Sequence, residues 1–338
     1  VIFFVRKRNI HLWWKDYFFG RREVVKGDPV HVLFCFVDHY EPQWGRPDYD
    51  TEVARVRRWV EDYPKLADGH GDAEGRVPQH TFFYPEEEYR PEHLQAIADL
   101  CASGYGEVEI HLHHDDDTAE GLRDKLNGFL KTLDEAHGLV PRHEDGRYAW
   151  SFIHGNWALD NSRADGRWCG VNNELAVLAE LGCYADFTLP SAPSDTQTST
   201  VNRIYYAQGQ DGQCKSHDTG VPVRVGGAPE GDLMIIQGPL GLDWGRRKWG
   251  LIPRIENSDL RASFPPTPER VDLWIKAGIT VEGRPDWLFV KVHTHGTQDP
   301  DMDTLLGDDA DRMFSYLESR YNDGQRYQLH YVNAREMY

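Results

Sequence analysis

The feature that most constrains the fold of this chain is a repeated alternation of short apolar segments with amphipathic ones. Residues 30–37, Val-His-Val-Leu-Phe-Cys-Phe-Val, are apolar almost throughout, which is typical of a strand buried on both faces of a parallel sheet. Further strands are predicted at 79–84, 107–113, 148–154, 184–189, 232–237, 287–293 and 327–332. Helical periodicity predicts helices at 51–67, 91–103, 118–136, 173–181, 267–277 and 308–321.

Strands that alternate with helices indicate an α/β protein with a parallel sheet. Seven or eight such units in 338 residues favour a distorted, TIM-like (β/α) barrel in a single domain. We expect the barrel to occupy residues 30–338, with long loops at about 191–231 and 238–266. Residues 1–29 are expected to form an N-terminal extension that packs on the barrel or leads into it.

Charge and composition exclude some classes of binding partner and some structural frameworks. The net charge of −18 disfavours nucleic acid and anionic membranes. Five scattered cysteines without a Cys-x-x-Cys pair predict no disulfide framework and no zinc knuckle. Three of them lie in apolar segments and are expected to be free buried thiols. No apolar run is long enough for a transmembrane helix. We expect a soluble protein, cytoplasmic rather than periplasmic, although the aromatic and basic N-terminus could contact a membrane surface or a partner.

Polar side chains gather where predicted strands end. Seven histidines and one aspartate lie at or just after the carboxyl ends of four strands: Asp38, His39, His111, His113, His114, His154, His293 and His295. In a (β/α) barrel that end carries the active site. Imidazoles and carboxylates that converge there are ligands for a first-row metal, most simply Zn²⁺ with an open position. We find no phosphate-binding loop, nucleophile elbow or His-Glu-x-x-His helix.

These segments resemble the polysaccharide deacetylases of the NodB-homology type, carbohydrate esterase family 4. The resemblance rests on Phe36-Val-Asp-His-Tyr40, Thr81-Phe-Phe-Tyr84 and the stretch Gly106-Glu-Val-Glu-Ile-His-Leu-His-His-Asp-Asp-Asp117. Their order and spacing match the family over residues 30–120, and more loosely to about 300. The family's arginine motif after the fourth strand is absent, and His154-Gly-Asn-Trp157 stands there.

The resemblance implies roles for individual residues. Asp38 falls on the family's catalytic base, and His293 or His295 falls on its general acid. The metal ligands would be His39, His113 and Asp117. Alternatively, Asp38 is a ligand and Glu41 or a neighbour is the base. His111 and His114 could also replace Asp117, because strand alternation would put His111 and His113 on one face.

The resemblance therefore predicts a zinc-dependent hydrolase that removes acetyl groups from an N- or O-acetylated glycan, using water activated by the metal. A polysaccharide or oligosaccharide would be the substrate. Trp157 and Trp244 could form a platform for sugar rings or serve packing alone. The candidate substrate-binding residues are Glu41, Tyr84, His154, Asn156, Trp157, Asp186 and Trp244.

Two other functions remain open at this stage. A glycoside hydrolase on a related barrel would use Asp38 or Glu41 with a second carboxylate from 115–117, about 5–10 Å apart. A glycan-binding barrel without catalytic activity would account for the altered motifs.

Overall fold

A curved, mostly parallel sheet forms the centre of the molecule. The computed structural model describes residues 7–210 and 212–338. The strands in those ranges are β1 (Val30–His39), β2 (His80–Pro85), β3 (Gly106–Leu112), β4 (Trp150–His154), β5 (Cys183–Asp186), β6 (Ile204–Ala207), β7 (Val221–Pro222), β8 (Leu233–Ile236), β9 (Gly241–Lys248), β10 (Ile252–Glu256), β11 (Asp259–Leu260), β12 (Trp287–Thr294) and β13 (Tyr327–Val332). Eleven of them share one sheet in the order β11-β12-β1-β2-β3-β4-β5-β8-β6-β7, and β13 also pairs with β1.

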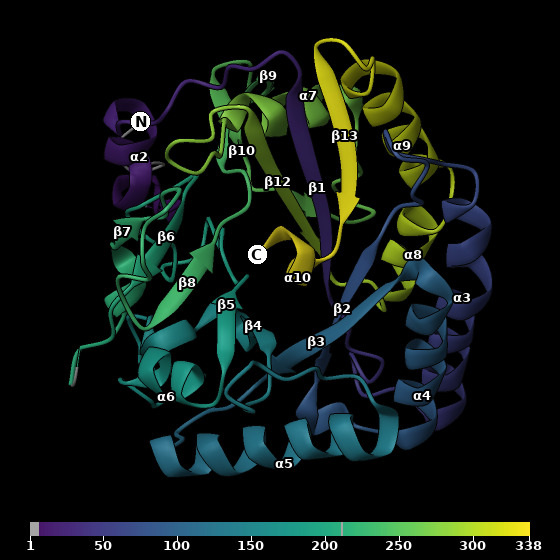
Figure 1. Cartoon of the computed structure of the whole chain (residues 1–338), viewed down its shortest axis with the longest axis vertical. Coiled ribbons are helices and arrows are strands. Elements are labelled where there is room, and N and C mark those ends of the chain that lie inside the picture. Colours follow the sequence, from purple (N-terminus) through teal and green to yellow (C-terminus); the bar gives the residue numbers. More distant parts are fainter. Residues whose placement is uncertain (1–6, 211) are drawn as a thin grey trace.

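Helices cover the outside of this curve. They are α2 (Ile10–Phe19), α3 (Tyr49–Ala67), α4 (Pro91–Leu100), α5 (Ala119–His137), α6 (Glu174–Glu180), α7 (Pro268–Ala277), α8 (Asp299–Leu305), α9 (Asp308–Tyr321) and α10 (Ala334–Met337). In Figure 1 the strands curve around the short helix α10, and α3 to α9 lie outside them. The predicted α/β alternation is therefore confirmed.

A closed barrel is not shown. Parallel pairing runs from β11 and β12 through β1 to β5 and on to β8, and the antiparallel strands β6 and β7 follow. No ladder joins β8 to β12 among the residues that the structure describes. Side-chain contacts nevertheless cross the gap, since Lys291 of β12 donates hydrogen bonds to the carbonyl oxygens of Phe187 and Leu189 just after β5.

The side chains of β1 alternate between two apolar layers. On β1, Val32, Phe34 and Phe36 pack in the larger cluster with residues of the outer helices. Cys35 and Val37 pack in a second cluster on the inner face of the curve. Both faces of the strand are therefore buried, which explains its continuous apolar sequence.

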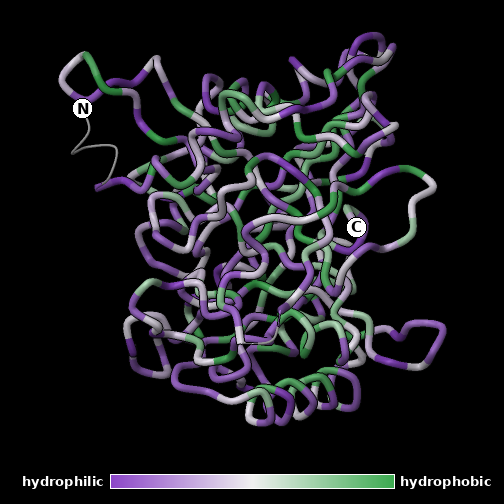
Figure 2. Tube along the Cα trace, turned by 90° about the vertical axis from the view of Figure 1, so that its left-hand side faces the viewer, coloured by the Kyte–Doolittle hydropathy of each residue, from purple (hydrophilic) through white to green (hydrophobic). Residues whose placement is uncertain are grey.

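Local signals set the ends of the helices. Thr118 caps α5 by accepting a hydrogen bond from the Gly121 backbone N–H, and Gly138 ends that helix in a left-handed conformation at φ 64°. Along the Cα trace of Figure 2, hydrophobic and hydrophilic residues alternate within this helix, as an amphipathic surface helix requires.

Helix α10 fills the amino end of the curve. Its Arg335 donates a hydrogen bond to Glu109 and lies beside Glu107, two carboxylates on the inner face of β3. Its Ala334 backbone N–H donates to Thr81 of β2. The polar groups at this end are thus occupied by the chain itself, which leaves the carboxyl ends of the strands for function.

The predicted loops contain additional structure. The segment 191–231 includes β6 and β7, and the segment 238–266 includes the β9–β10 hairpin and β11. The N-terminal extension packs through α2, where Trp13 is fully buried against Val201 and Leu242. Residues 1–6, where part of the proposed membrane or partner contact falls, lie outside the described residues. None of the described helices is both long and apolar enough to cross a membrane.

Candidate metal centres

Two clusters of metal-ligating side chains lie at the carboxyl ends of the parallel strands. One group is Glu41, His111 and His113, and the other is His114, His154, Cys169 and Glu174; in each group the ligand atoms lie within 4.8 Å of one another. We call them the open cluster and the buried cluster. The chain separates them just beyond β3, because His113 contacts Glu41 and the next residue, His114, contacts Glu174.

In the open cluster, two imidazoles face one carboxylate. His113 Nε2 lies 3.1 Å and His111 Nε2 lies 3.7 Å from the same oxygen, Glu41 Oε1. The cluster is accessible from outside, since the side chain of His113 is 30% exposed. Gly155 allows this packing: a Cβ there would lie 2.3 Å from Cδ2 of the His113 ring.

The second nitrogen of each ring is already occupied. His111 Nδ1 lies 2.7 Å from the Ile153 carbonyl oxygen, which can only accept, so Nδ1 carries the proton. Its Nε2 then presents a lone pair and has no hydrogen-bond partner although it is buried. His113 Nδ1 lies 2.5 Å from Glu87 Oε1. A proton donated from Nδ1 to a carbonyl or carboxylate is the usual arrangement behind a metal-bound histidine.

The electrostatics of the open cluster favour a cation. Burial raises the pKa of Glu41, but the adjacent imidazoles of His111 and His113 outweigh this and hold that pKa below its ordinary range. Burial lowers the pKa of His113, yet hydrogen bonds to Glu41 and Glu87 raise it to about 10. Two carboxylates thus share one imidazole, and a positive charge at this point is stabilised by both.

Further histidines surround the open cluster. The ring of His39 lies edge-on to those of His111 and His295, with centroids 4.8 and 4.5 Å away. Burial and the neighbouring imidazoles lower the pKa of His39 well below its ordinary value, so its ring is neutral. His295 Nδ1 lies 3.7 Å from Glu41 Oε2, and its side chain is 26% exposed. His293 lies deeper, buried, with its centroid 6.4 Å from that of His39.

The turn after β4 contributes an aromatic wall. Asn156 and Trp157 both adopt left-handed conformations, at φ 54° and 56°. Strain of this kind persists where the surrounding structure holds it, often at functional sites. The Trp157 ring lies 6.0 Å from that of His295 and 6.3 Å from that of His39, centroid to centroid.

Asp38, predicted as the base, lies on the other face of β1 from His39. Its Oδ2 lies 3.0 Å from Nε2 of the buried His80, and its Oδ1 accepts a hydrogen bond from the Gly296 backbone N–H at 2.6 Å. A Cβ at Gly296 would lie 2.0 Å from Oδ2. Asp38 therefore anchors the segment that carries His295, and the structure does not bring it to either cluster.

Other predicted residues are distributed as follows. Asp117 contacts His114 and Lys125 on the side of the buried cluster. Tyr84 packs among the outer helices and donates to the Glu88 carbonyl. Asp186 is buried and bonded to Thr188, and burial raises its pKa to about 7. Trp244 lies on β9, 52% exposed and away from both clusters.

Three residues in or beside the clusters were not predicted from the sequence: Cys169 and Glu174 of the buried cluster, and Glu87, which contacts His113 of the open cluster. Glu87 belongs to a run of three glutamates after β2, which reads as a solvated turn. Cys169 reads as an isolated buried thiol, and Glu174 as an ordinary residue in the first turn of a helix. The available signal was the position of all three just beyond strand ends, or in the connection that follows one.

No model of a known protein family matches the chain, and no curated protein matches it.

Proposed function

We propose that this protein is a metal-dependent hydrolase whose active site is the open cluster, and that it removes acetyl groups from a glycan. The observation that carries the proposal is the convergence of Nε2 of His111 and His113 on Glu41, with both Nδ1 atoms already facing an acceptor. The resemblance to the NodB-type deacetylases supplies the reaction and the class of substrate. The same resemblance favours an open (β/α) barrel, in which β8 and β12 approach without pairing.

Two histidines and a glutamate are a known ligand set of catalytic zinc sites, which keep a position free for water or substrate. Glu41, His111 and His113 would hold the ion, and Glu87 would orient His113 through Nδ1. A divalent ion bound there would polarise a carbonyl oxygen and make water more acidic. The partial exposure of His113 and His295 leaves room for a substrate on the open side.

His295 is best placed to move a proton. It is a partly exposed histidine beside Glu41 that does not belong to the proposed ligand set, and its ring lies between those of His39 and Trp157. We assign it the protonation of the leaving group, the general-acid role that the resemblance offered to His293 or His295. His293 is buried behind it, and Asp38 holds the following turn through Gly296.

A cationic cavity near the end of β12 supports a substrate that carries an acidic group. This cavity of about 500 Å³ is lined by Arg8, Lys248, Arg254 and Arg261 and by no acidic residue, although Arg261 also forms an ion pair with Asp259 at 2.6 Å. Asn257 and Arg261 of its lining flank β11, which pairs with His293 and Thr294 at the end of β12. In a chain of net charge −18 such a lining is a local exception that suits a carboxylated or sulfated sugar.

The alternative of a glycoside hydrolase has less support. That reaction needs two carboxyl groups facing each other across the substrate. Of the candidate carboxylates, Asp38 is bonded to His80 and Gly296. Within 115–117, Asp115 accepts from the Trp168 backbone N–H and Asp117 is bonded to Lys125, and neither contacts Glu41 or its histidines His111 and His113.

The test is acetate release from acetylated oligosaccharides by the purified protein. Activity should disappear after treatment with a strong chelator and return with Zn²⁺ or another first-row divalent ion. Product chains should keep their length and gain free amines or hydroxyls. Shortened chains would support the glycosidase, and tight glycan binding without turnover under any metal would support the non-catalytic alternative.

A further inference from the structure

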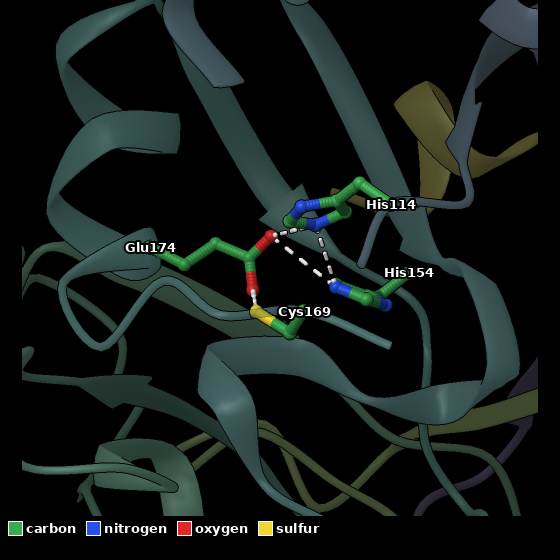
Figure 3. Close-up of side chains that lie close together, drawn as sticks. All are labelled: His114, His154, Cys169 and Glu174. Carbon is green, nitrogen blue, oxygen red and sulfur yellow. Dashed lines mark hydrogen bonds and ion pairs between the residues drawn. The ribbon is translucent and has the colours of Figure 1, made fainter. Parts of the chain in front are cut away.

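The buried cluster brings together side chains from four segments. His114 follows β3, His154 ends β4, Cys169 lies in the connection after β4, and Glu174 begins α6. In Figure 3 the four side chains point toward one another, with Glu174 between the two imidazoles and the thiol. His114 Nε2 lies 2.9 Å from His154 Nε2 and 3.0 Å from Glu174 Oε1, and His154 Nε2 lies 3.4 Å from that oxygen.

The two imidazoles and the carboxylate converge on one point. His154 Nδ1 lies 2.6 Å from the Gly155 carbonyl oxygen, which can only accept, so the proton of His154 is on Nδ1 and its Nε2 presents a lone pair. His114 Nδ1 lies 3.1 Å from Asp117 Oδ2 but has no hydrogen-bond partner, although it is buried. Both Glu174 Oε1 and His154 Nε2 lie within hydrogen-bond distance of His114 Nε2, and a metal ion at this point would be bound by all three atoms.

Cys169 completes the set as a fourth donor. Its Sγ–H donates to Glu174 Oε2 at 3.4 Å, and the sulfur accepts hydrogen bonds from the backbone N–H groups of Asn161 and Val171 at 3.3 and 3.4 Å. A metal ion would displace the thiol proton, and the two N–H donors would stabilise the resulting thiolate, the form that binds metals. Glu174 Oε2 is itself oriented by the Asp160 backbone N–H at 2.6 Å.

Charge and burial suit a divalent ion. The side chains of His154 and Glu174 are fully buried and that of His114 is 1% exposed. Once the thiol proton is displaced, one divalent ion would neutralise the two negative charges of the buried carboxylate and thiolate. Lys125, the nearby ammonium group, is occupied by Asp117 at 2.6 Å.

We propose that His114, His154, Cys169 and Glu174 bind a second, structural metal ion, and that the ion is Zn²⁺. Two imidazoles, a thiolate and a carboxylate are zinc ligands, and structural zinc sites are closed to solvent with four protein donors. The proposal is independent of the proposed hydrolase function, because it concerns a different set of side chains.

The position of this centre gives it a mechanical role. His114 is adjacent in sequence to His113 of the open cluster, and His154 is adjacent to Gly155, on which the His113 ring packs. An ion that joins His114 to His154 therefore fixes the ends of β3 and β4 relative to each other. It would also hold the strained turn at Asn156 and Trp157.

The test uses the full chain with its metals replaced by Co²⁺. A cysteine thiolate bound to Co²⁺ gives an intense near-ultraviolet charge-transfer absorption, which the open cluster, with no cysteine, does not produce. We expect this absorption in the wild-type protein, its loss in Cys169→Ser, and its retention in the matched control Cys183→Ser, a buried cysteine outside the cluster. Elemental analysis should show about one fewer zinc per chain in Cys169→Ser than in the control.

The spectrum of the wild-type protein decides the question even if Cys169→Ser fails to fold. Absence of thiolate-to-cobalt absorption in folded, cobalt-loaded wild type would overturn the proposal and leave the cluster held by hydrogen bonds alone. The same conclusion would follow if Cys169→Ser and Cys183→Ser contained equal amounts of zinc.

Discussion

The open and buried clusters are built alike and differ in access to solvent. Each contains two histidines that approach one glutamate. The Nδ1 atom of each histidine lies 2.5–3.1 Å from a backbone carbonyl or carboxylate oxygen. The side chain of His113 is 30% exposed, whereas that of His114, the next residue, is 1% exposed. Closed sites with four protein donors stabilise folds, and open sites with three leave a position for substrate. Two consecutive residues just beyond β3, His113 and His114, thus belong to a proposed catalytic centre and a proposed structural one.

His70 shows how a histidine is placed when a proton supplies the charge. Its Nδ1 lies 3.2 Å from Glu318 and its Nε2 lies 3.2 Å from Asp311, so each nitrogen has its own carboxylate. No lone pair faces another in this arrangement. The two clusters differ from it because the Nε2 atoms of separate histidines converge on a single oxygen.

The largest effect should follow His113→Ala. Loss of this ligand removes the polarising ion, which contributes several kcal/mol to catalysis, so activity should fall by roughly 10³-fold or more. His137→Ala changes a histidine remote from both clusters and should retain full activity. Unchanged acetate release from His113→Ala would show that the open cluster is not the active site.

His295→Asn should separate proton transfer from metal binding. We expect kcat to fall by about 10²–10⁴-fold, the usual contribution of a general acid, while the metal content of the protein stays that of the wild type. Steady-state kinetics with parallel metal analysis measures both quantities. If kcat is unaffected, a group other than His295 protonates the leaving group.

His154→Gln should affect stability more than chemistry. Removing one member of a buried, charged cluster leaves its partners unsatisfied and typically costs about 3–5 kcal/mol of unfolding free energy. Urea unfolding of this variant should show that loss, whereas His143→Gln, outside both clusters, should stay close to wild type. Equal stabilities of the two variants would remove the distinction between a structural and a catalytic centre.

Glu87→Gln should weaken metal binding at the open cluster alone. Carboxylates that orient a metal-bound histidine typically contribute 10–100-fold to metal affinity or activity. Titration of the metal-free protein should show a weaker open site, with most of the activity restored by excess metal. Glu86→Gln, on the same turn, serves as the control, and an affinity unchanged by Glu87→Gln would contradict the assigned role of this carboxylate.

The smallest expected effect concerns His70. The hydrogen bond to Glu318, together with Asp311, raises the pKa of His70 above its ordinary value of 6.5. A raised pKa means that the folded state binds the proton more tightly, so this contribution is complete below pH 6.5 and is lost as pH rises through the folded pKa. His70→Gln should therefore lower the unfolding free energy more at pH 5.5 than at pH 9. An equal loss at both values would show that His70 contributes through packing alone.

Much of the fold could be predicted because its signals are local. The apolar run of β1, the Thr118 cap and the glycine that ends α5 each specify their own segment. The β9–β10 hairpin could not be recognised although its pairing is local, because β9 carries mostly polar residues and glycine in place of an alternating apolar pattern. Helix α10 could not be recognised because distant residues position it. Arg335, for example, is placed by its contacts with Glu107 and Glu109.

The candidate site was predictable to the extent that strand alternation was applied. Alternation suggested that His111 and His113 share a face, and the structure places both beside Glu41. The same rule at β1 separates Asp38 from His39, yet the family resemblance had favoured Asp38 as the base. Cys169 and Glu174 lie far along the chain from His114, and no local pattern marks such a partnership.

Metal release from the purified protein tests the central claim, two centres with two roles, most directly. Zinc content, activity and folding would be followed together during incubation with a strong chelator. We predict about two equivalents at the start, with one lost early together with the activity and the other retained until the chain unfolds. A single equivalent at the start, or the loss of both ions in one step without unfolding, would contradict the account.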